Sequence, residues 1–313
     1  MLEIKNPWIL KILKKSQILL NIMENATFDF EKNNVEVITL DTLKGTRNET
    51  DYGYQPVNGI QHYDFIDAIL NKISQNGLDG KLETIYAGRG GSRTVPGVSF
   101  IGDVNSEGSK RVLKNYILRR VIGKILISNL ATEEYMGAVA FSYHQLGLEI
   151  AIGANIRICG NMSIYGKQFF FSTYGDDKLP NINRLYEVLD DYLAKYEETM
   201  AMQKKFIDGL KSIALPREHV AELIGDLTFL RISHDNNEMK DQPKYPLNQS
   251  QVGALAEKYL VEEYKKKSAQ PIQLFDLYNY ATNMYKPGET DFPNVLVCNS
   301  RLGQYLIDKF NLN

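Results

Sequence analysis

The chain has 313 residues, of which 43% are hydrophobic, and its 36 basic and 38 acidic side chains give a net charge of −2 at pH 7. This composition excludes a disordered or fibrous chain and leaves room for one large core or two smaller ones. The near-neutral total also excludes a surface coated uniformly with positive charge, but it allows a local basic patch.

Residues 1–30 predict an N-terminal amphipathic helix. Pro7 suits a first helical position, and apolar residues from Ile9 to Met23 follow the three-four spacing of one helix face. Lys11, Lys14 and Lys15 interrupt the apolar run, so it is neither a signal peptide nor a membrane span. We expect this helix to dock on the body or on a neighbouring subunit, with attachment to a membrane surface as the alternative.

Residues 31–180 predict a sheet-rich domain. Short apolar or alternating runs, several of them rich in β-branched or aromatic residues, are separated by turns. A helix is expected from His62 to Ile73. The strand-like runs are Val35–Leu40, Leu82–Tyr86, Val98–Ile101, Ile117–Ile127, Ala138–Tyr143, Leu148–Ile158 and Gln168–Thr173. This part of the chain therefore predicts a curved, mainly antiparallel sheet.

Residues 181–313 return to the helical period. Apolar residues from Leu185 to Ile213 predict one helix of about thirty residues that ends before Pro216. Further helices are expected over Arg217–Arg231 and Gln249–Lys267, from Pro271 onward, and over Arg301–Phe310 with Ser300 as its cap. The predicted fold class is α+β, with a helical region that packs on the sheet domain or extends from it.

The sequence contains no motif typical of a catalytic or metal site. HExxH, CxxC, GxSxG and a phosphate-binding loop are all absent, and no two of the four histidines lie close together in sequence. We therefore expect no metal and no cofactor. Cys159 and Cys298 are the only cysteines, which excludes a disulfide scaffold and favours the cytoplasm. An enzyme whose site is assembled from dispersed residues remains as an alternative.

Positive charge is concentrated between residues 81 and 130. Nine basic and three acidic residues give this segment a charge of +6, so the rest of the chain carries −8. Cations with aromatic residues among them are what phosphates and unpaired bases require. The alternative is an ordinary amphipathic element whose charges spread over the surface. The candidate phosphate contacts are Arg89, Arg93, Lys110, Arg111, Lys114, Arg119, Arg120 and Lys124, and the candidate stacking partners are Tyr86 and Tyr116.

A motif follows between Ile152 and Ser163, where Gly153, Cys159 and Asn161 fit the pattern IGxxxxxCxN. This run resembles a segment of bacterial domain-of-unknown-function family 3871 and, more distantly, the Cys-x-Asn core of the phage and plasmid-like family 932. The resemblance implies a gene carried by a mobile element and supplies no catalytic residues. Because the cysteine lies in an apolar run before a turn-forming Gly-Asn pair, a bent sheet corner is expected rather than a nucleophile.

These features together predict a non-enzymatic nucleic-acid-binding protein of a phage or plasmid. It would act on single strands in replication, recombination or annealing, and it would form a homo-oligomer through its first helix or its long helix. No membrane partner is expected. The alternative is an interaction protein that uses its acidic helical half to bind a host protein or to serve in a particle.

Overall fold

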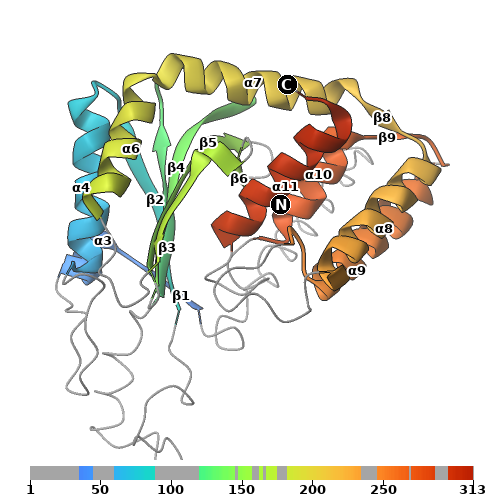
Figure 1. The fold of residues 1–313 in the computed structure, drawn as a ribbon, viewed down its shortest axis with the longest axis horizontal. Coiled ribbons are helices and arrows are strands. Elements are labelled where there is room, and N and C mark those ends of the chain that lie inside the picture. Colours follow the sequence, from blue (N-terminus) through green and yellow to red (C-terminus); the bar gives the residue numbers. More distant parts are fainter. Residues whose placement is uncertain are drawn as a thin grey trace, which may run out of the picture.

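The computed structural model describes residues 35–44, 60–88, 120–144, 147–156, 162–164, 167–174, 182–233, 245–267, 269–285 and 295–312. The expected helix within residues 1–30 and the expected strand Val98–Ile101 lie outside these ranges. An open antiparallel sheet occupies the first half and mostly helices occupy the second (Figure 1). The predicted α+β class, with its order of sheet before helices, is confirmed.

Within the described ranges the sheet has seven strands, and every pairing between them is antiparallel. The spatial order follows the chain from β1 to β5, and both β6 and β7 pair with β5. The strands are β1 (Val35–Ile38), β2 (Gly80–Gly88), β3 (Arg120–Ile127), β4 (Tyr135–His144), β5 (Gly147–Ile156), β6 (Met162–Ser163) and β7 (Phe170–Tyr174). Since each of the first five strands pairs with the next one in the chain, the order needs no crossover between distant strands.

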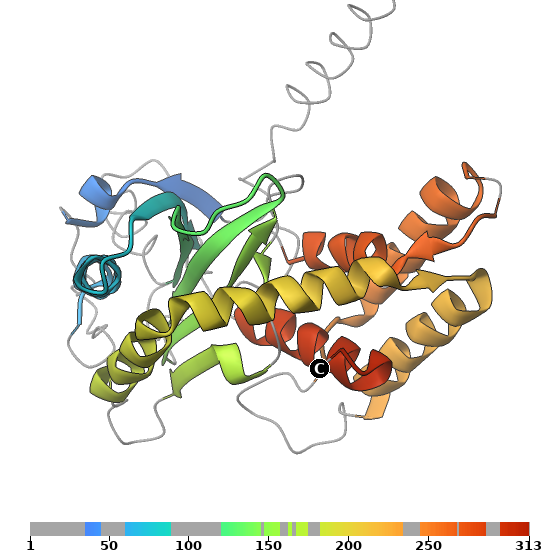
Figure 2. The ribbon, with the colours of Figure 1, turned by 90° about the horizontal axis from the view of Figure 1, so that it is seen from above.

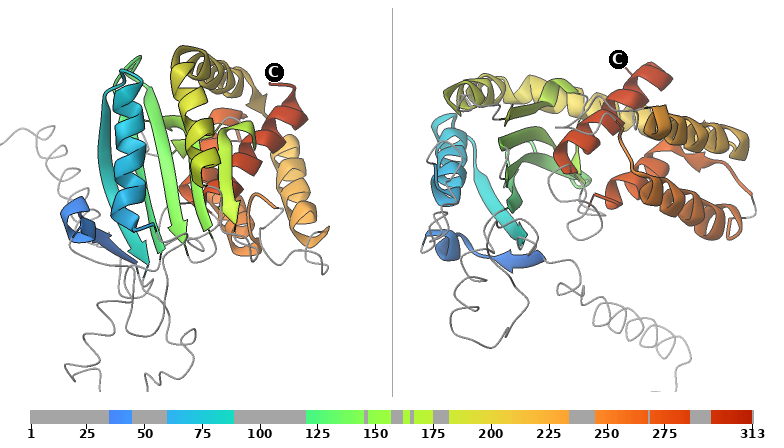
Figure 3. Two further views of the ribbon diagram at one scale, coloured as in Figure 1. Left: turned by 60° about the vertical axis from the view of Figure 1, so that its left-hand side comes forward. Right: turned by 60° about the horizontal axis from the view of Figure 1, so that its bottom comes forward.

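One face of the sheet is covered by α4 (His62–Gln75) and α6 (Ile182–Ala194), which lie side by side across it (Figure 3). Short helix α3 (Leu40–Lys44) lies near the start of α4. The ring of Phe65 on α4 meets that of Phe141 on β4 edge to face, at 6.4 Å between centroids. Both rings are fully buried, so α4 is fixed to the middle of the sheet by apolar contact.

The histidine at the start of α4 makes stability depend on pH. His62 is 1% exposed against the ring of Tyr143, and burial lowers its pKa from 6.5 to about 3. An unfolded chain takes up a proton at this histidine below pH 6.5, whereas the folded chain does not. The contribution of His62 to the free energy of unfolding is therefore complete above pH 6.5. It is lost as the pH falls from 6.5 toward 3, by up to about 1.4 kcal/mol per pH unit.

We expect His62→Phe to remove this loss, because phenylalanine fills the same aromatic site without titrating. Urea denaturation of both proteins at pH 7, 6, 5 and 4 measures the difference. Equal decreases for wild type and variant between pH 6.5 and 4 would contradict the assignment to His62.

The predicted thirty-residue helix is wrong, because the structure has two helices there. Helix α6 ends at Ala194 and α7 (Tyr196–Ser212) begins after a non-helical Lys195. Helix α6 follows the sheet face, whereas α7 runs across the end of the sheet to the helical half (Figure 2). The Tyr196 hydroxyl donates a hydrogen bond to the Asn129 carbonyl at 3.2 Å and lies against Gly137, where any Cβ would lie 1.9 Å from it. The chain turns so that this ring can occupy that site.

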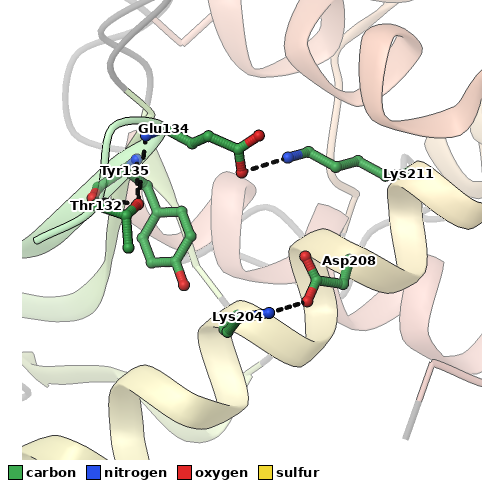
Figure 4. A network of polar contacts seen from close by, with 6 residues as sticks. All are labelled: Thr132, Glu134, Tyr135, Lys204, Asp208 and Lys211. Atoms are coloured by element: carbon green, nitrogen blue, oxygen red, sulfur yellow. Dashed lines mark hydrogen bonds and ion pairs between the residues drawn. The ribbon is translucent and has the colours of Figure 1, made fainter. Parts of the chain in front are cut away.

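Polar contacts tie α7 to the start of β4 (Figure 4). The Lys211 ammonium lies 2.6 Å from the Glu134 carboxylate, and Lys204 forms an ion pair with Asp208 along α7. The Thr132 hydroxyl donates to the carbonyl of Tyr135 at 3.1 Å and so closes the turn before β4. Of these contacts, the ion pair between Lys211 and Glu134 joins α7 to the sheet end from which the helical half continues.

The helical half begins with β8 (Ala214–Leu215), which pairs with β9 (Ile272–Gln273). Two expected boundaries are wrong. Pro271 precedes β9 rather than a helix, and Ser300 lies inside the last helix, where its hydroxyl donates to the Val297 carbonyl instead of capping. The helices are α8 (Arg217–Ser233), α9 (Gln249–Lys258), the π-helix η5 (Tyr259–Tyr264), α10 (Leu274–Asn283) and α11 (Val295–Phe310).

Sheet and helical half share one continuous hydrophobic core. Helix α11 lies against β5 and β6 on the side away from α4 (Figures 1 and 3). The Asn299 amide donates to the Met162 carbonyl at 2.8 Å, and the Tyr278 and Ser163 hydroxyls lie 3.0 Å apart. Within the described ranges, no helix is long and apolar enough to span a membrane.

Candidate nucleic-acid interface

The basic segment is the connection between two paired strands. Strand β2 ends at Gly88 and β3 begins at Arg120, and these two residues are register partners in the antiparallel ladder. Residues 89–119 therefore connect, in the chain, two points of the sheet that are adjacent in space. This connection contains six Lys or Arg residues and two acids, a net charge of +4, and Arg120 follows directly. Six of the eight predicted cations thus lie in the chain between these two paired strand ends.

Other chain segments start or end at the same end of the sheet, which we call the basic end. Strand β1 begins opposite Gly88, while β4 ends at His144 and β5 begins at Gly147. Tyr174, the last residue of β7, is the register partner of Gly147. The basic end is therefore broad, because it spans the ends of the neighbouring strands from β1 to β5.

The structure places only part of the predicted interface. Seven of the predicted residues lie outside the described ranges: Arg89, Arg93, Lys110, Arg111, Lys114, Tyr116 and Arg119. Arg120 is described as the first residue of β3, without its side chain. Tyr86 and Lys124 are fully described. They lie on neighbouring strands, with Tyr86 paired to Ile122 and Lys124 two residues further along β3.

Tyr86 lies in a cross-strand row near the basic end. Its register partners are Val37 on β1 and Ile122 on β3, so the three side chains share one face of the sheet. Val37 is 50% exposed and Ile122 is buried, which leaves the tyrosine half-buried between them. Burial raises the pKa of its phenol, with a further rise from Glu83. The phenol is thus neutral at physiological pH, and part of the side chain is accessible.

Lys124 is bound within the sheet instead of standing free at the surface. Its ammonium lies 3.0 Å from the Glu83 carboxylate on β2 and donates to the side-chain oxygen of Asn155 on β5 at 2.6 Å. The lysine side chain is 20% exposed, and Asn155 is buried. A phosphate would have to compete with both partners for this ammonium, so Lys124 is a weak candidate for a phosphate contact.

Gly153 is the member of the trio Gly153, Cys159 and Asn161 that lies within the described ranges, and its role there is structural. A Cβ at this position would lie 2.0 Å from the carbonyl oxygen of Ser163 on β6, so a side chain cannot be accommodated without moving the backbone. Cys159 and Asn161 lie outside the described residues, as does the side chain of His144. The glycine therefore permits the close β5–β6 approach that a bent corner needs.

A separate cavity of about 550 Å³ lies at the other end of the sheet, where α4 ends and α7 begins. Its charged lining residues are Lys195, Glu197 and Glu198, and it is lined by neither histidine nor cysteine. In the described part of the chain, no cluster of His, Cys, Asp and Glu could hold a metal ion. The charged groups that line this cavity are therefore one ammonium and two carboxylates.

Comparison with known proteins does not identify a relative. No protein-family model, curated protein or solved structure matches the chain.

Proposed function

We propose that this protein is a non-enzymatic nucleic-acid-binding protein that contacts single strands through the basic end of its sheet. The observation that carries the proposal is the pairing of Gly88 with Arg120, which brings together the two points of the sheet that the cation-rich residues 89–119 connect. A polyanion is attracted by clustered cations whatever its sequence, and exposed parts of aromatic rings can contact unpaired bases, for which the half-buried Tyr86 is the described candidate. Origin from a phage or plasmid and action in the cytoplasm are parts of the same proposal, and they rest on the motif resemblance and on cysteine usage.

The test is a salt titration of binding to a fluorescein-labelled single-stranded DNA oligonucleotide. We expect binding at low salt that weakens steeply as salt is added. The double substitution Arg119→Glu and Arg120→Glu should lower the affinity by at least about tenfold, because two phosphate contacts become repulsive. No binding by the wild type at low salt would overturn the proposal.

A matched control separates local contact from net charge. Lys265→Glu with Lys266→Glu makes the same change in net charge on two exposed lysines of the helical half. We expect this variant to bind nearly as well as wild type. Equal losses in both double variants would assign the attraction to total charge instead of the basic end. Recovery of a stoichiometric host protein with no nucleic acid would favour the alternative of a protein-binding factor.

A further inference from the structure

The face of the sheet opposite α4, which we call the open face, is covered unevenly. Helix α11 lies against β4, β5 and β6, whereas β1 and β2 lie toward the edge of the sheet that is away from the helical half (Figure 3). Burial along one cross-strand row follows the same order. The members of this row, from β5 to β1, are successive register partners: Glu149, Ser142, Ile122, Tyr86 and Val37. Exposure rises along the row from 0% at Glu149 to 50% at Val37, so the open face is accessible over β1 and β2.

A β-bulge places a cation and an aromatic residue of β2 together on the open face. Lys81 pairs with Leu126 and Tyr86 pairs with Ile122, so five positions on β2 are matched by four on β3. The extra residue is taken up by a bulge that lies between the two pairs. In a regular strand, side chains five positions apart point to opposite faces. The bulge is therefore what puts Lys81 and Tyr86 on the same face.

The charges on this part of the open face favour an anionic ligand. Lys81 is exposed, and within the described ranges no acid forms an ion pair with it. The carboxylate of Glu83 is already bound by Lys124 at 3.0 Å, so its charge is compensated. Asp79, which precedes β2, marks the limit of the surface beyond Lys81. At the other end of β2 begins the connection of net charge +4, so positive charge lies at both ends of this strand.

We propose that the single strand runs over the open face of β1 and β2, from the basic end to Lys81. Val37 and Tyr86 contact its bases, and Lys81 binds one of its phosphates. This inference rests on the proposed binding of single strands. It adds to that function a path across the sheet and two contact residues, Val37 and Lys81.

The occupant is an unpaired strand because the order of side chains along β2 matches the chemistry of such a strand. Apolar and aromatic side chains between cations complement bases between phosphates, whereas the bases of a duplex are stacked and paired with one another. Seven positions separate Lys81 from Gly88, which corresponds to at most about 23 Å of strand. The path is therefore long enough for several nucleotides of one strand to contact both ends of β2.

Fluorescence from position 86 tests the path directly. Trp8 is the only tryptophan in the chain, so the variant Trp8→Phe with Tyr86→Trp reports from this position alone. We expect single-stranded oligothymidylate to quench the emission, because bases stack on the indole, and a base-free sugar-phosphate strand of the same length to leave it unchanged. If the oligothymidylate binds by anisotropy but leaves the emission unchanged, the path is wrong while the proposed function stands.

The phosphate contact is tested by Lys81→Glu. We expect this change to lower the affinity for the single strand at low salt by about tenfold and to reduce the slope of log affinity against log salt by about 1. The matched control is Lys205→Glu, which makes the same change in charge on an exposed lysine of α7 and should bind nearly as well as wild type. Equal affinities of the two variants would contradict a contact at Lys81.

The base contact at β1 is tested by Val37→Glu, which leaves the fold intact because the side chain is 50% exposed. A carboxylate on the path repels the strand, so we expect weaker binding than in Met202→Glu, which charges another exposed apolar residue on α7. Binding by the full-length chain that is lost in Arg119→Glu with Arg120→Glu, but unaffected by Lys81→Glu and Val37→Glu, would overturn the path alone. No binding by the wild type would overturn the proposed function as well.

Discussion

Replacing residues 89–119 by the dipeptide Asn-Gly should strongly weaken binding to a single strand while leaving the fold intact. Gly88 and Arg120 are antiparallel register partners, and a two-residue turn is the usual connection between such partners. Removal of six cations should lower the affinity at low salt on the order of 100-fold and should reduce the slope of log affinity against log salt by about 4. Fluorescence anisotropy at several salt concentrations measures both quantities.

Stability is the control for this variant. Shortening the connection lowers the entropy cost of closing it, so the free energy of unfolding should rise by about 2 kcal/mol. Urea denaturation and far-ultraviolet circular dichroism can check this on the same sample. A variant that is folded and stable yet binds the strand as tightly as wild type would show that the basic segment is not the contact surface.

Gly153→Ala should destabilise the protein by about 3 kcal/mol, near the upper end of the usual cost of overpacking. The new methyl group would lie 2.0 Å from the carbonyl of Ser163, and relief of this clash requires β6 to move away from β5. Because β6 also bonds to Asn299 and Tyr278, such a movement loosens the contact between the sheet and the helical half. Thermal and urea denaturation measure the loss.

A second glycine provides the matched comparison. At Gly253 on α9 a Cβ would meet no atom within 4 Å, so Gly253→Ala should stabilise the protein by up to about 1 kcal/mol through helix propensity. The two variants make the same chemical change with opposite signs. A destabilisation of similar size in both would mean that the clash at Gly153 is not the cause.

The sequence showed where along the chain the cations lie, but not how they are placed in the fold. The charge count put them within one stretch, in which the strand pattern also predicted the strand Val98–Ile101, which lies outside the described residues. The contacts of Lys124 could not be predicted from the sequence. Its neighbours in sequence gave it the appearance of a surface cation, whereas Glu83 and Asn155 reach it from β2 and β5, which lie far from it in the chain. The pairing of the strands from β2 to β5 decides that contact.

The break at Lys195 has a similar cause. The helical period of the apolar residues continues through it, because residues on both sides are buried. Their burial is against different partners, since α6 covers the sheet and α7 spans its end. The small size of Gly137 is what admits Tyr196 at the turn, and nothing in the sequence near Lys195 encodes the position of that glycine.

The amino-acid sequence by itself determined the α+β class, the sheet before the helices, most strand positions, the inner face of α8 and the clustering of positive charge. These features depend on the period of apolar residues and on composition, which are local properties. Only the tertiary structure decided that Gly88 faces Arg120, that Lys124 is held inside the sheet, that one long apolar run is two helices and that Phe229 is left exposed. Each of these is set by which distant surfaces meet, because burial and pairing are properties of the folded chain as a whole.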